Sequence, residues 1–396
     1  MLDSIFIGTS GLQTFSSGLK SISNNIANLN TPGFKSSSTL FSNLYYSSSS
    51  DGSGQLAADA NQFGGGVVLS QTVLNFRSGE LRQTGNPLDL SVNGEGFFIT
   101  RKDGSGESHY SRAGQFEFNK DGVLVARGTD RQVIGLGASG EQPISLNGLR
   151  ISAPKPTSAI TMSGNLSSSI TDFSIASFKV IDSIGGEHTL KMTFAPKAGS
   201  PGTWVVKVLD GSAEVTSGEI KFASGRTVPV FDRIDFSYAP TGVAPSNIKL
   251  DFSGNVTSFD TGSTSSLAIG STDGYAMGNL AKVSFDAEGT MVLGYSNGQT
   301  AKGPKLALAA FDANAMLSPQ GGSEFTYSSL GGLHVGAANQ GQFGSIGSNQ
   351  IEGSNVDLAT EFSDLIVAQR GYQASSRIVS TANDLIQDLL DMKGHR

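Results

Sequence analysis

The sequence predicts a mostly β fold with paired α-helices at its two ends, built as nested β-barrel or β-sandwich domains on a coiled-coil stem. Near both ends of the 396-residue chain, apolar residues recur every three or four positions, which is the spacing of a coiled-coil seam. Between the ends, the pattern alternates with a period of two, which is typical of strands. Glycine is abundant, at 51 residues, and only 15% of residues are charged, which suits many tight turns and broad packed contacts.

The first helix is predicted over residues 3–29. Its seam consists of Met1, Ile5, Gly8, Leu12, Phe15, Leu19, Ile22, Ile26 and Leu29. Pro32 lacks an N–H and disfavours helix at the residue before it, and Gly33 favours a turn. The helix should therefore stop near Asn30.

The segment 31–66 is predicted to be a linker, because residues 36–66 are rich in Ser and Gly. Three aromatic residues interrupt this composition, namely Phe41, Tyr45 and Tyr46. They indicate that part of the segment docks onto another element.

The central region is predicted to contain two β domains. Residues 67–150 and 275–351 form the first domain, and residues 151–274 form an outer domain inserted into it. The boundaries are placed at a Pro-rich joint, 153–156, and at a polar stretch, 261–274.

Turn signals between alternating segments predict β-hairpins in this region. They lie at Asn93-Gly94, Asp121-Gly122, Asp210-Gly211 and the stretch 286–289. Many short strands with frequent turns favour barrels or sandwiches.

The last helix is predicted to run to about Met392, with Gly394 as its stop and with Ser354 and Asp357 spaced like a capping box at its start. Its seam consists of Leu358, Phe362, Leu365, Gln369, Tyr372, Ser376, Val379, Asn383, Ile386 and Leu390. The polar members of this seam allow two interpretations. They face solvent or a wet channel, or they are buried and fix register and partner number.

The two helices, within residues 1–30 and 352–396, are predicted to pack together as one helical domain. Such a pair still leaves apolar flanks exposed, so we expect further copies of the chain to cover them. The expected subunit-packing residues are Leu12, Phe15, Leu19, Ile22, Ile26, Leu29, Leu358, Phe362, Leu365, Tyr372, Val379, Ile386 and Leu390. Because ordering a helix costs conformational entropy, we expect residues 1–66 and 352–396 to be mobile in an isolated monomer.

The sequence offers little support for chemistry. It has no Cys, and its four His residues lack metal-ligand spacing. The G-x-G-x-x-G pattern at 135–140 is followed by a strand-like segment, whereas a nucleotide loop needs a helix there. We therefore predict no catalytic residue, no metal, no cofactor and no enzymatic activity.

The sequence also argues against several partners and locations. It has no run of five basic residues, so neither nucleic acid nor a membrane surface is an expected partner. It has no apolar run of the ~20 residues that span a bilayer. Its first twenty residues lack the charged start of a secretory signal.

Both terminal regions resemble the signatures of bacterial flagellar rod, hook and basal-body proteins. Residues 22–35, ISNNIANLNTPGFK, are similar to the family's N-terminal signature, and residues 354–358 and 369–374 to its C-terminal one. The matching positions are Asn24, Asn25, Asn28, Pro32, Gly33, Phe34, Asn355, Gln369 and Arg370. Residues 93–98 and 110–116 resemble the family's β domain, and residues 178–190 its inserted hook domain. The resemblance is weakest at 36–66 and 210–260.

This resemblance implies a structural subunit of the hook, a curved extracellular tube that transmits torque from basal body to filament as a universal joint. It implies that terminal helices line the tube and that β domains form its outer layers. The implied partners are other copies of the chain, the hook cap, distal-rod and hook–filament junction proteins, and the flagellar export apparatus, which exports the subunit without a cleaved signal.

Two alternatives remain open. One is a distal-rod-type axial protein, although rod proteins are shorter and lack a large insertion. The other is an extracellular β-sandwich binding module, which would leave the two terminal stripes unexplained.

Overall fold

The computed structural model describes residues 2–44, 46–49, 61–137, 140–328 and 331–394. Helix α1 (Leu2–Ala27) opens the chain and helix α2 (Leu358–Gly394) closes it, with strands and the short 3₁₀ helix η1 (Asn314–Met316) between them. The predicted fold class, mostly β with paired terminal helices and nested β domains, is confirmed. The predictions for Met1, Tyr45, residues 50–60 and His395 fall outside the described residues.

The chain divides into two compact units. Unit 1 comprises Met1–Asn147, Val283–Val292 and Lys302–Arg396, and unit 2 comprises Gly148–Lys282 and Leu293–Ala301. The insertion placed at 151–274 lies inside unit 2. Unit 2 also contains residues 275–282, which the sequence analysis assigned to the first β domain, because β23 (Gly278–Phe285) pairs with β13 (Ile151–Ser152).

Helix α1 ends where Pro32 and Gly33 predicted it to end. The N–H of Asn28 still donates to Asn24 O, and Gly33 then takes a φ of +68°. At the start of α2, Asp357 is the N-cap, since its Oδ1 accepts the N–H of Ala359 at 2.9 Å. Ser354 instead accepts the N–H of Val356, so the expected capping box does not form.

The segment 31–66 is not simply a linker. It contains β1 (Ser37–Asn43), which pairs antiparallel with β4 (Val67–Leu74), as well as β2 (Tyr46–Ser49) and β3 (Asn61–Gly64). Phe41 lies with its ring centroid 6.1 Å from that of Phe15 on α1, in an edge-to-face contact. Contacts with the helix therefore override the flexible composition of this segment.

The β domain of unit 1 is built around β7 (Phe97–Lys102), which pairs with β8 (Ser108–Ser111), β11 (Arg131–Gly137) and β25 (Thr300–Phe311). Its core includes Phe97, Ile99, Tyr110, Ile134, Leu317 and Phe325. The other strands from β5 onward are β5 (Leu81–Gln83), β6 (Leu90–Asn93), β9 (Phe116–Phe118), β10 (Leu124–Ala126), β12 (Gly140–Pro143), β24 (Thr290–Tyr295), β26 (Leu317–Gly321), β27 (Glu324–Tyr327), β28 (Leu333–Ala337), β29 (Ser345–Ser348) and β30 (Gln350–Glu352).

The hairpin predicted at Asn93-Gly94 is wrong. Strand β6 pairs with β29, more than 250 residues further along the chain, and β7 pairs with β8. The hairpin at Asp121-Gly122 is confirmed as β9–β10, and the turn at 286–289 joins the neighbouring strands β23 and β24.

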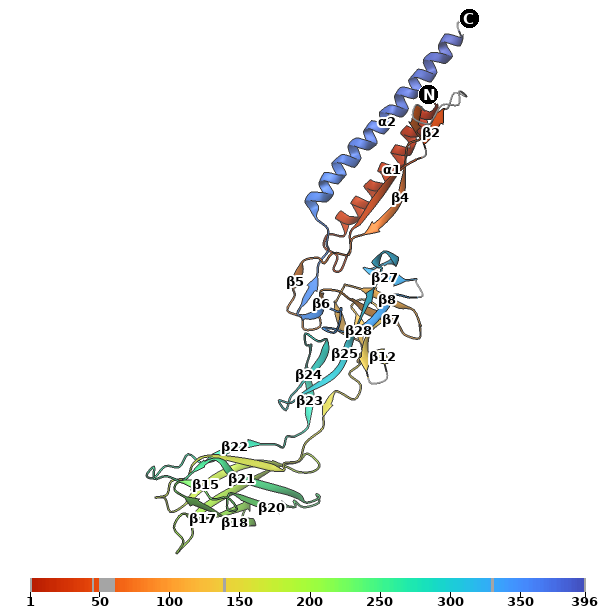
Figure 1. The fold of residues 1–396 in the computed structure, drawn as a ribbon. Helices are drawn as coiled ribbons and strands as arrows, with labels where there is room; N and C mark the ends of the chain where they lie inside the picture. The colour runs from red at the N-terminus through yellow and green to blue at the C-terminus, as the bar shows by residue number, and fades with distance from the viewer. Residues whose placement is uncertain (1, 45, 50–60, 138–139, 329–330, 395–396) are drawn as a thin grey trace. The chain divides into compact units, whose positions relative to one another are not determined.

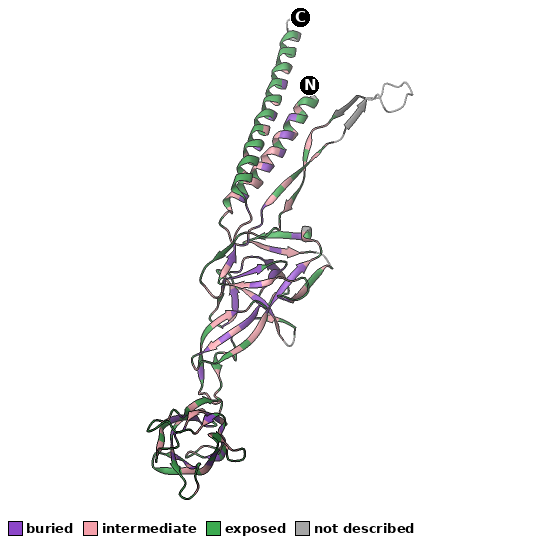
Figure 2. Cartoon of the chain, turned by 60° about the vertical axis from the view of Figure 1, so that its left-hand side comes forward, coloured by how far each residue is buried: buried purple, intermediate pink, exposed green. Residues whose placement is uncertain are grey.

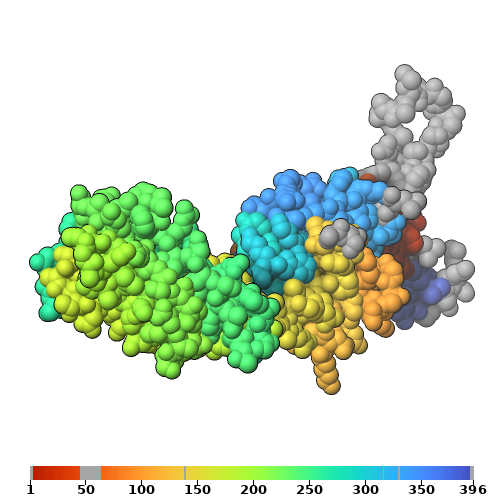
Figure 3. All heavy atoms as spheres, turned by 90° about the horizontal axis from the view of Figure 1, so that it is seen from below, coloured from red at the N-terminus to blue at the C-terminus, as the bar shows by residue number. Residues whose placement is uncertain are grey.

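Unit 2 is a β-barrel, visible end-on as a ring of strands in Figure 2 and as a closely packed green body in Figure 3. Its sheet has the order β15-β16-β17-β18-β19-β21-β14-β22, with β20 paired to β21. The strands are β14 (Ala159–Asn165), β15 (Phe173–Ile181), β16 (Glu187–Pro196), β17 (Thr203–Asp210), β18 (Ala213–Ala223), β19 (Arg226–Thr227), β20 (Arg233–Tyr238), β21 (Ser246–Thr257) and β22 (Ala268–Thr272). The predicted hairpin at Asp210-Gly211 is confirmed as β17–β18.

The barrel closes on its own core. Trp204, Phe194 and Phe252 are buried, and the last two rings meet edge to face. Among the described residues, no helix is long and apolar enough to cross a membrane.

Candidate functional site

The two terminal helices lie side by side through small residues (Figure 1). A Cβ added at Gly8 of α1 would lie 2.6 Å from Val379 Cγ2, and one added at Gly11 would lie 2.6 Å from Ser375 Oγ. A Cβ at Gly371 of α2 would lie 2.4 Å from the Phe15 ring. Glycine inside a helix lowers helix stability by about 1 kcal/mol relative to alanine. At these positions, the close approach of the two helices requires glycine despite this cost.

The fully buried residues of α2 lie one position before every second residue of the predicted seam. Ala368, Ser375 and Ala382 are buried. Of the predicted α2 residues, Leu365, Val379 and Ile386 are half-buried, and the exposed ones are Leu358, Phe362, Gln369, Tyr372, Ser376, Asn383 and Leu390. On α1, the predicted residues Leu12, Phe15, Leu19, Ile22 and Ile26 are all half-buried, as is Leu29 in the turn that follows the helix.

Helix α2 therefore leaves large apolar residues exposed to solvent. Figure 2 colours most of α2 as exposed. One row has the spacing seven, four and three of a heptad seam and consists of Ile378, Leu385, Leu389 and Met392. Phe362 and Ile366, four residues apart, extend another flank, and Phe362 is 52% exposed. Large apolar side chains exposed on one face of a helix are typical of surfaces that contact other proteins.

Asn25 fastens three elements together. Its side chain is buried, and its Nδ2 donates to Ser37 O of β1 and to Glu361 Oε1 of α2, both at 2.8 Å. The N–H of Ser37 donates back to Asn25 Oδ1 at 3.0 Å. Burial raises the pKa of Glu361, which the bond from Asn25 partly opposes.

The turn after α1 is closely packed on the β domain. The N–H of Gly33 donates to Glu352 O at 2.9 Å, and a Cβ at Gly33 would lie 2.4 Å from the backbone N of Ala113. Its φ of +68° favours glycine as well. Pro32 and Phe34 on either side are half-buried.

A buried cluster of three charges, Lys35, Glu352 and Arg112, joins this turn to the β domain. Lys35 Nζ contacts Glu352 Oε1 at 2.5 Å, and Arg112 Nη1 contacts Glu352 Oε2 at 3.2 Å. Burial lowers the pKa of Lys35, and Glu352 opposes this effect. Arg112 also donates to Gly94 O at 2.7 Å and lies over the Phe97 ring.

Asn355 completes the junction. Its Oδ1 accepts the N–H of Ser36 at 2.7 Å, and its Nδ2 donates to Asn75 O at 2.7 Å and to Arg77 O at 3.0 Å. The amide thus ties the start of the last helical segment to the strand that follows the first helix.

We call the contacts of Asn25, Gly33, Asn355 and the three buried charges the junction. Sequence spacing missed Lys35, Arg112 and Glu352, because 240 or more residues separate Glu352 from each partner.

The other signature positions are less enclosed. Asn28 is half-buried, and its Nδ2 donates to Asn24 O at 2.9 Å, while Asn24 itself is exposed. Gln369 and Arg370 are exposed on α2.

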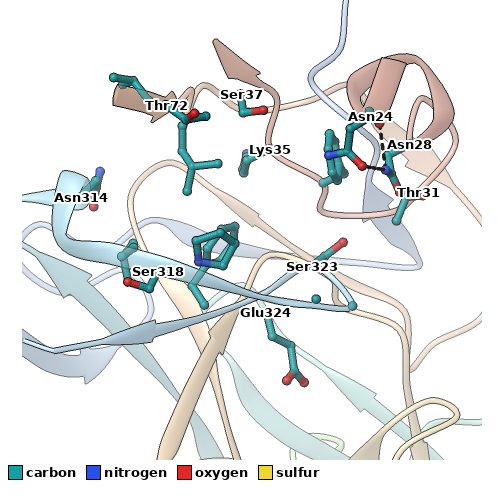
Figure 4. A pocket seen from close by; sticks show the side chains of 18 of the residues that line it. Asn24, Asn28, Thr31, Lys35, Ser37, Thr72, Asn314, Ser318, Ser323 and Glu324 are labelled. Atoms are coloured by element: carbon teal, nitrogen blue, oxygen red, sulfur yellow. Dashed lines mark hydrogen bonds between the residues drawn. The ribbon is translucent and has the colours of Figure 1, made fainter. Parts of the chain in front are cut away.

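A cleft of about 700 Å³ lies beside the junction. In Figure 4, Asn24 of α1 lines it together with Asn28 and Thr31 of the turn that follows, and Ser318 and Ser323 line it from the hairpin β26–β27. The Glu324 carboxylate points away from the cleft, toward its salt bridge with Arg131. The cleft is mostly apolar and uncharged polar in character.

The described histidines do not converge. His109 lies near Glu324, His188 contacts Asp182 Oδ2 at 2.8 Å, and His334 pairs with Asp312. Within the described ranges, no three His, Asp or Glu side chains gather as a metal site. The pattern at 135–140 lies in the β11–β12 hairpin, without a following helix.

Small-residue helix pairing, exposed apolar rows on α2 and a nested barrel define a class of β proteins with a terminal helix pair, an arrangement suited to contact with further helices. Family profiles match along the chain: flagella basal body rod protein at 5–35, flagellar hook protein FlgE/F/G D1 domain at 91–169, flagellar basal body protein FlaE D2 domain at 167–330, and flagellar basal body rod FlgEFG protein C-terminal at 348–392. The chain belongs to the flagellar rod and hook protein family.

Its similarity to hook proteins extends over nearly the full length. The flagellar hook protein FlgE of Escherichia coli (strain K12) is 29% identical over 97% of this chain and 98% of its own. That of Borreliella burgdorferi is 28% identical over 99% of this chain and 100% of its own. The solved Helicobacter pylori flagellar hook protein FlgE2 aligns over 67% of this chain and 98% of its own, at 13% identity and a TM-score of 0.47.

Proposed function

We propose that the chain is the structural subunit of a bacterial flagellar hook and polymerises into a curved, flexible tube that transmits torque from basal body to filament. The supporting observation is the full-length similarity to hook proteins, which includes the inserted domain at 167–330. A distal-rod-type axial protein is the second candidate. It is disfavoured because rod proteins lack a large insertion of this kind.

Assembly is proposed to occur through the exposed flanks of α2. Burying one Leu, Ile or Phe side chain contributes about 1.5–3 kcal/mol, and these flanks offer several such side chains. Ordering the helices costs about 1–2 kcal/mol per residue, so an isolated pair gains little and neighbouring copies complete its stabilisation. On this proposal, the terminal segments become firmly ordered only on assembly.

The junction is proposed to pass load between the helices and the β domain of unit 1. Breaking a buried ion pair leaves an uncompensated charge, which makes this connection stiff. The junction combines buried ion pairs with a close backbone contact that only glycine permits. Such contacts suit a connection that must stay rigid when the tube carries torque.

The partners beyond self-assembly are part of the proposal. We infer contacts at the ends of the tube with hook cap, distal-rod and hook–filament junction proteins. We also infer export through the flagellar export apparatus without a cleaved signal, which places the assembled protein outside the cell.

The test is assembly of Leu389→Asp, with Gln387→Asp as the matched control. Leu389 is 49% exposed, so its replacement leaves the single chain intact but places a charge in the proposed contact. We expect tubes from the parent and the control by negative-stain microscopy, and none from Leu389→Asp. In the same samples, helix amides should exchange rapidly in dilute monomer and slowly in tubes.

Two outcomes would contradict the proposal. One is a parent protein that stays monomeric at high concentration, which would favour a binding module. The other is tubes from Leu389→Asp that match the parent in yield, which would remove α2 from the contact.

A further inference from the structure

Helix α2 carries charged residues that recur every seven positions and form one exposed row: Arg370, Arg377, Asp384 and Asp391. The first three of them come two positions after Ala368, Ser375 and Ala382, the residues of α2 that are fully buried. Because successive residues of a helix are about 100° apart, the row lies nearly opposite those buried residues. It therefore runs along the side of α2 that faces away from α1, and we call it the charge row.

The signs along the charge row are segregated. The two cations precede the two anions, and no Asp or Glu lies three or four positions from Arg370 or Arg377, where a helical ion pair would form. Among the described residues, the salt bridges all lie outside the row. Asp388 lies four positions after Asp384 and three before Asp391, so it adds repulsion between like charges. Within one copy, this pattern lowers helix stability.

Asp391 adds a second unfavourable feature. It lies in the last turn of α2, which ends at Gly394, and the helix dipole disfavours a carboxylate there. The order of signs in the charge row therefore does not stabilise the helix that carries it. It suits a partner with the opposite order of charges at the same level.

Apolar residues flank the charge row on both sides. On one side, three exposed residues each come one position after a member of the row: Ile378, Leu385 and Met392. We call these three the first flank. Phe362 and Ile366 lie eight and four positions before Arg370, which places them on the other side of the row, and we call them the second flank. Because the two flanks differ, contact of one with the other repeats head to tail between identical copies.

The charge row distinguishes the possible offsets between two parallel copies of α2 that lie side by side. Without an offset, each charge lies beside its own counterpart and is repelled. An offset of seven residues matches one pair of opposite charges, but it also places Arg370 beside Arg377 and Asp384 beside Asp391. An offset of fourteen residues places Asp384 beside Arg370 and Asp391 beside Arg377, without a like pair. Complementary charges therefore favour an offset of fourteen residues.

The apolar flanks favour the same offset independently. With fourteen residues of offset, Ile378 of one copy lies level with position 364 of the next, midway between Phe362 and Ile366. A side chain that inserts between residues four apart on a neighbouring helix is the ordinary mode of helix packing. The offset corresponds to about 21 Å along the helix axis.

We propose that α2 of one copy packs in parallel against α2 of a second copy with this offset, so that the first flank meets the second flank and the two charge rows pair. The inference rests on the proposed function, because helical symmetry supplies parallel copies, and it names the partner and register of the assembly contact. Packed helices lie about 8–10 Å apart, a distance that Arg side chains span. Exposed ion pairs are weak, so the charges select the register while the apolar flanks supply most of the stabilisation.

The first test reverses one charge and then its proposed partner. Arg377→Glu places a carboxylate beside Asp391 of the neighbouring copy, so the concentration needed for tube assembly should rise about fivefold. Adding Asp391→Arg to the same chain should bring it back to within about twofold of the parent. The rise should shrink at high ionic strength, because salt screens exposed charges.

The matched control combines Arg377→Glu with Asp384→Arg. This pair of changes gives complementary charges only for an offset of seven residues, so it should not restore assembly. All of these positions are exposed, and thermal unfolding of unit 2 checks that each variant is intact.

The second test uses the absence of cysteine from the chain. Ile378→Cys combined with Ile366→Cys should give a ladder of disulfide-linked subunits when tubes are oxidised, and reduction should abolish it. About 18 Å of helix separates the two positions within one copy, so the link must join two copies. The matched control replaces Ile366→Cys by Gln373→Cys, seven residues further along the same side of α2. With the proposed offset, its partner lies about 13 Å away along the axis, so we expect no ladder.

The outcomes separate this inference from the proposed function. A parent protein that forms no tubes contradicts the proposed function and the inference with it. The inference alone is overturned if parent tubes form but Arg377→Glu assembles like the parent, or if Asp384→Arg restores assembly and Asp391→Arg does not. Equal ladders from the 378–366 and 378–373 cysteine pairs would also overturn it.

Discussion

The terminal helices and the barrel of unit 2 differ in what they bury. The barrel encloses large side chains such as Trp204, Phe194 and Phe252 within a single copy. The contact of α1 with α2 instead buries small residues such as Ala368 and Ala382, while Leu389 and Phe362 of α2 stay exposed. Because hydrophobic stabilisation scales with apolar area, we expect the barrel to be stable by itself, and we propose that the exposed apolar side chains of α2 contact other copies.

The comparison teaches how one chain combines independence with assembly. A region that must fold before assembly closes its own core. The helix pair, which we propose as the assembling region, keeps close backbone contact within the copy through Gly8, Gly11 and Gly371 and leaves large side chains of α2 exposed. The junction resembles the helix pair rather than the barrel in this respect. Its buried groups are charges, not large apolar side chains.

The largest expected effect comes from Glu352→Ala. It leaves Lys35 and Arg112 buried without their carboxylate, so unit 1 should lose about 3–5 kcal/mol of unfolding free energy. Unit 2 should unfold as before. Because the terminal segments are expected to be ordered only in the tube, denaturant unfolding of assembled tubes measures both, with Trp204 fluorescence following the barrel and helix circular dichroism following unit 1.

The matched control is Glu219→Ala, which breaks the exposed pair with Lys197 in the barrel. Pairs of this kind contribute about 0–1 kcal/mol. Equal losses of unfolding free energy from the two variants would mean that the buried charges stabilise the junction no more than an exposed pair stabilises the barrel.

A smaller effect is expected when a methyl group is added to the helix contact. Gly371→Ala places a Cβ 2.4 Å from the Phe15 ring, so overpacking should cost about 1–3 kcal/mol despite the better helix propensity of alanine. Gly18→Ala meets Phe41 at an ordinary 3.4 Å and should gain up to about 1 kcal/mol. Unfolding of the helices in assembled tubes measures both changes in stability. If both variants were stabilised or both destabilised, close approach of the helices would not explain why residue 371 is glycine.

The smallest effect concerns the acid stability of the barrel. Burial alone acts to raise the pKa of Asp273, but hydrogen bonds from Ser158 and Ala159 lower it to about 2. The folded pKa lies below that of the unfolded chain, about 3.9, so this stabilisation is present above about pH 4 and is lost as the pH falls toward about 2.

Asp273→Asn should therefore flatten the decline in the unfolding temperature of unit 2 between about pH 4 and about pH 2. Thermal unfolding at several pH values measures this slope. An unchanged slope would show that other carboxylates, such as Asp251, account for the acid sensitivity.

Local patterns predicted those elements whose partners are near in sequence. Heptad spacing found both helices, Pro32 and Gly33 found the end of α1, and Asp210-Gly211 found the β17–β18 hairpin. The same reasoning failed at Asn93-Gly94, because the strand before it pairs with β29 rather than with its neighbour. A turn signal describes the chain locally and contains no information about a distant strand that competes for the same edge.

The signature asparagines show a similar division. Their spacing indicated a family, but the hydrogen bonds they make depend on the fold. Asn25 connects α1 to β1 and α2, and Asn355 connects the segment before α2 to the segment after α1. Glu352 had no sequence signal, because a carboxylate becomes a buried partner only when the fold removes it from water.

By itself, the sequence determined that two amphipathic helices enclose a β-rich middle, because helix and strand periodicities are local properties of side-chain order. Only the tertiary structure decided which face of each helix is used within the copy and which charges are buried together. These depend on distances between residues hundreds of positions apart, which no local pattern fixes.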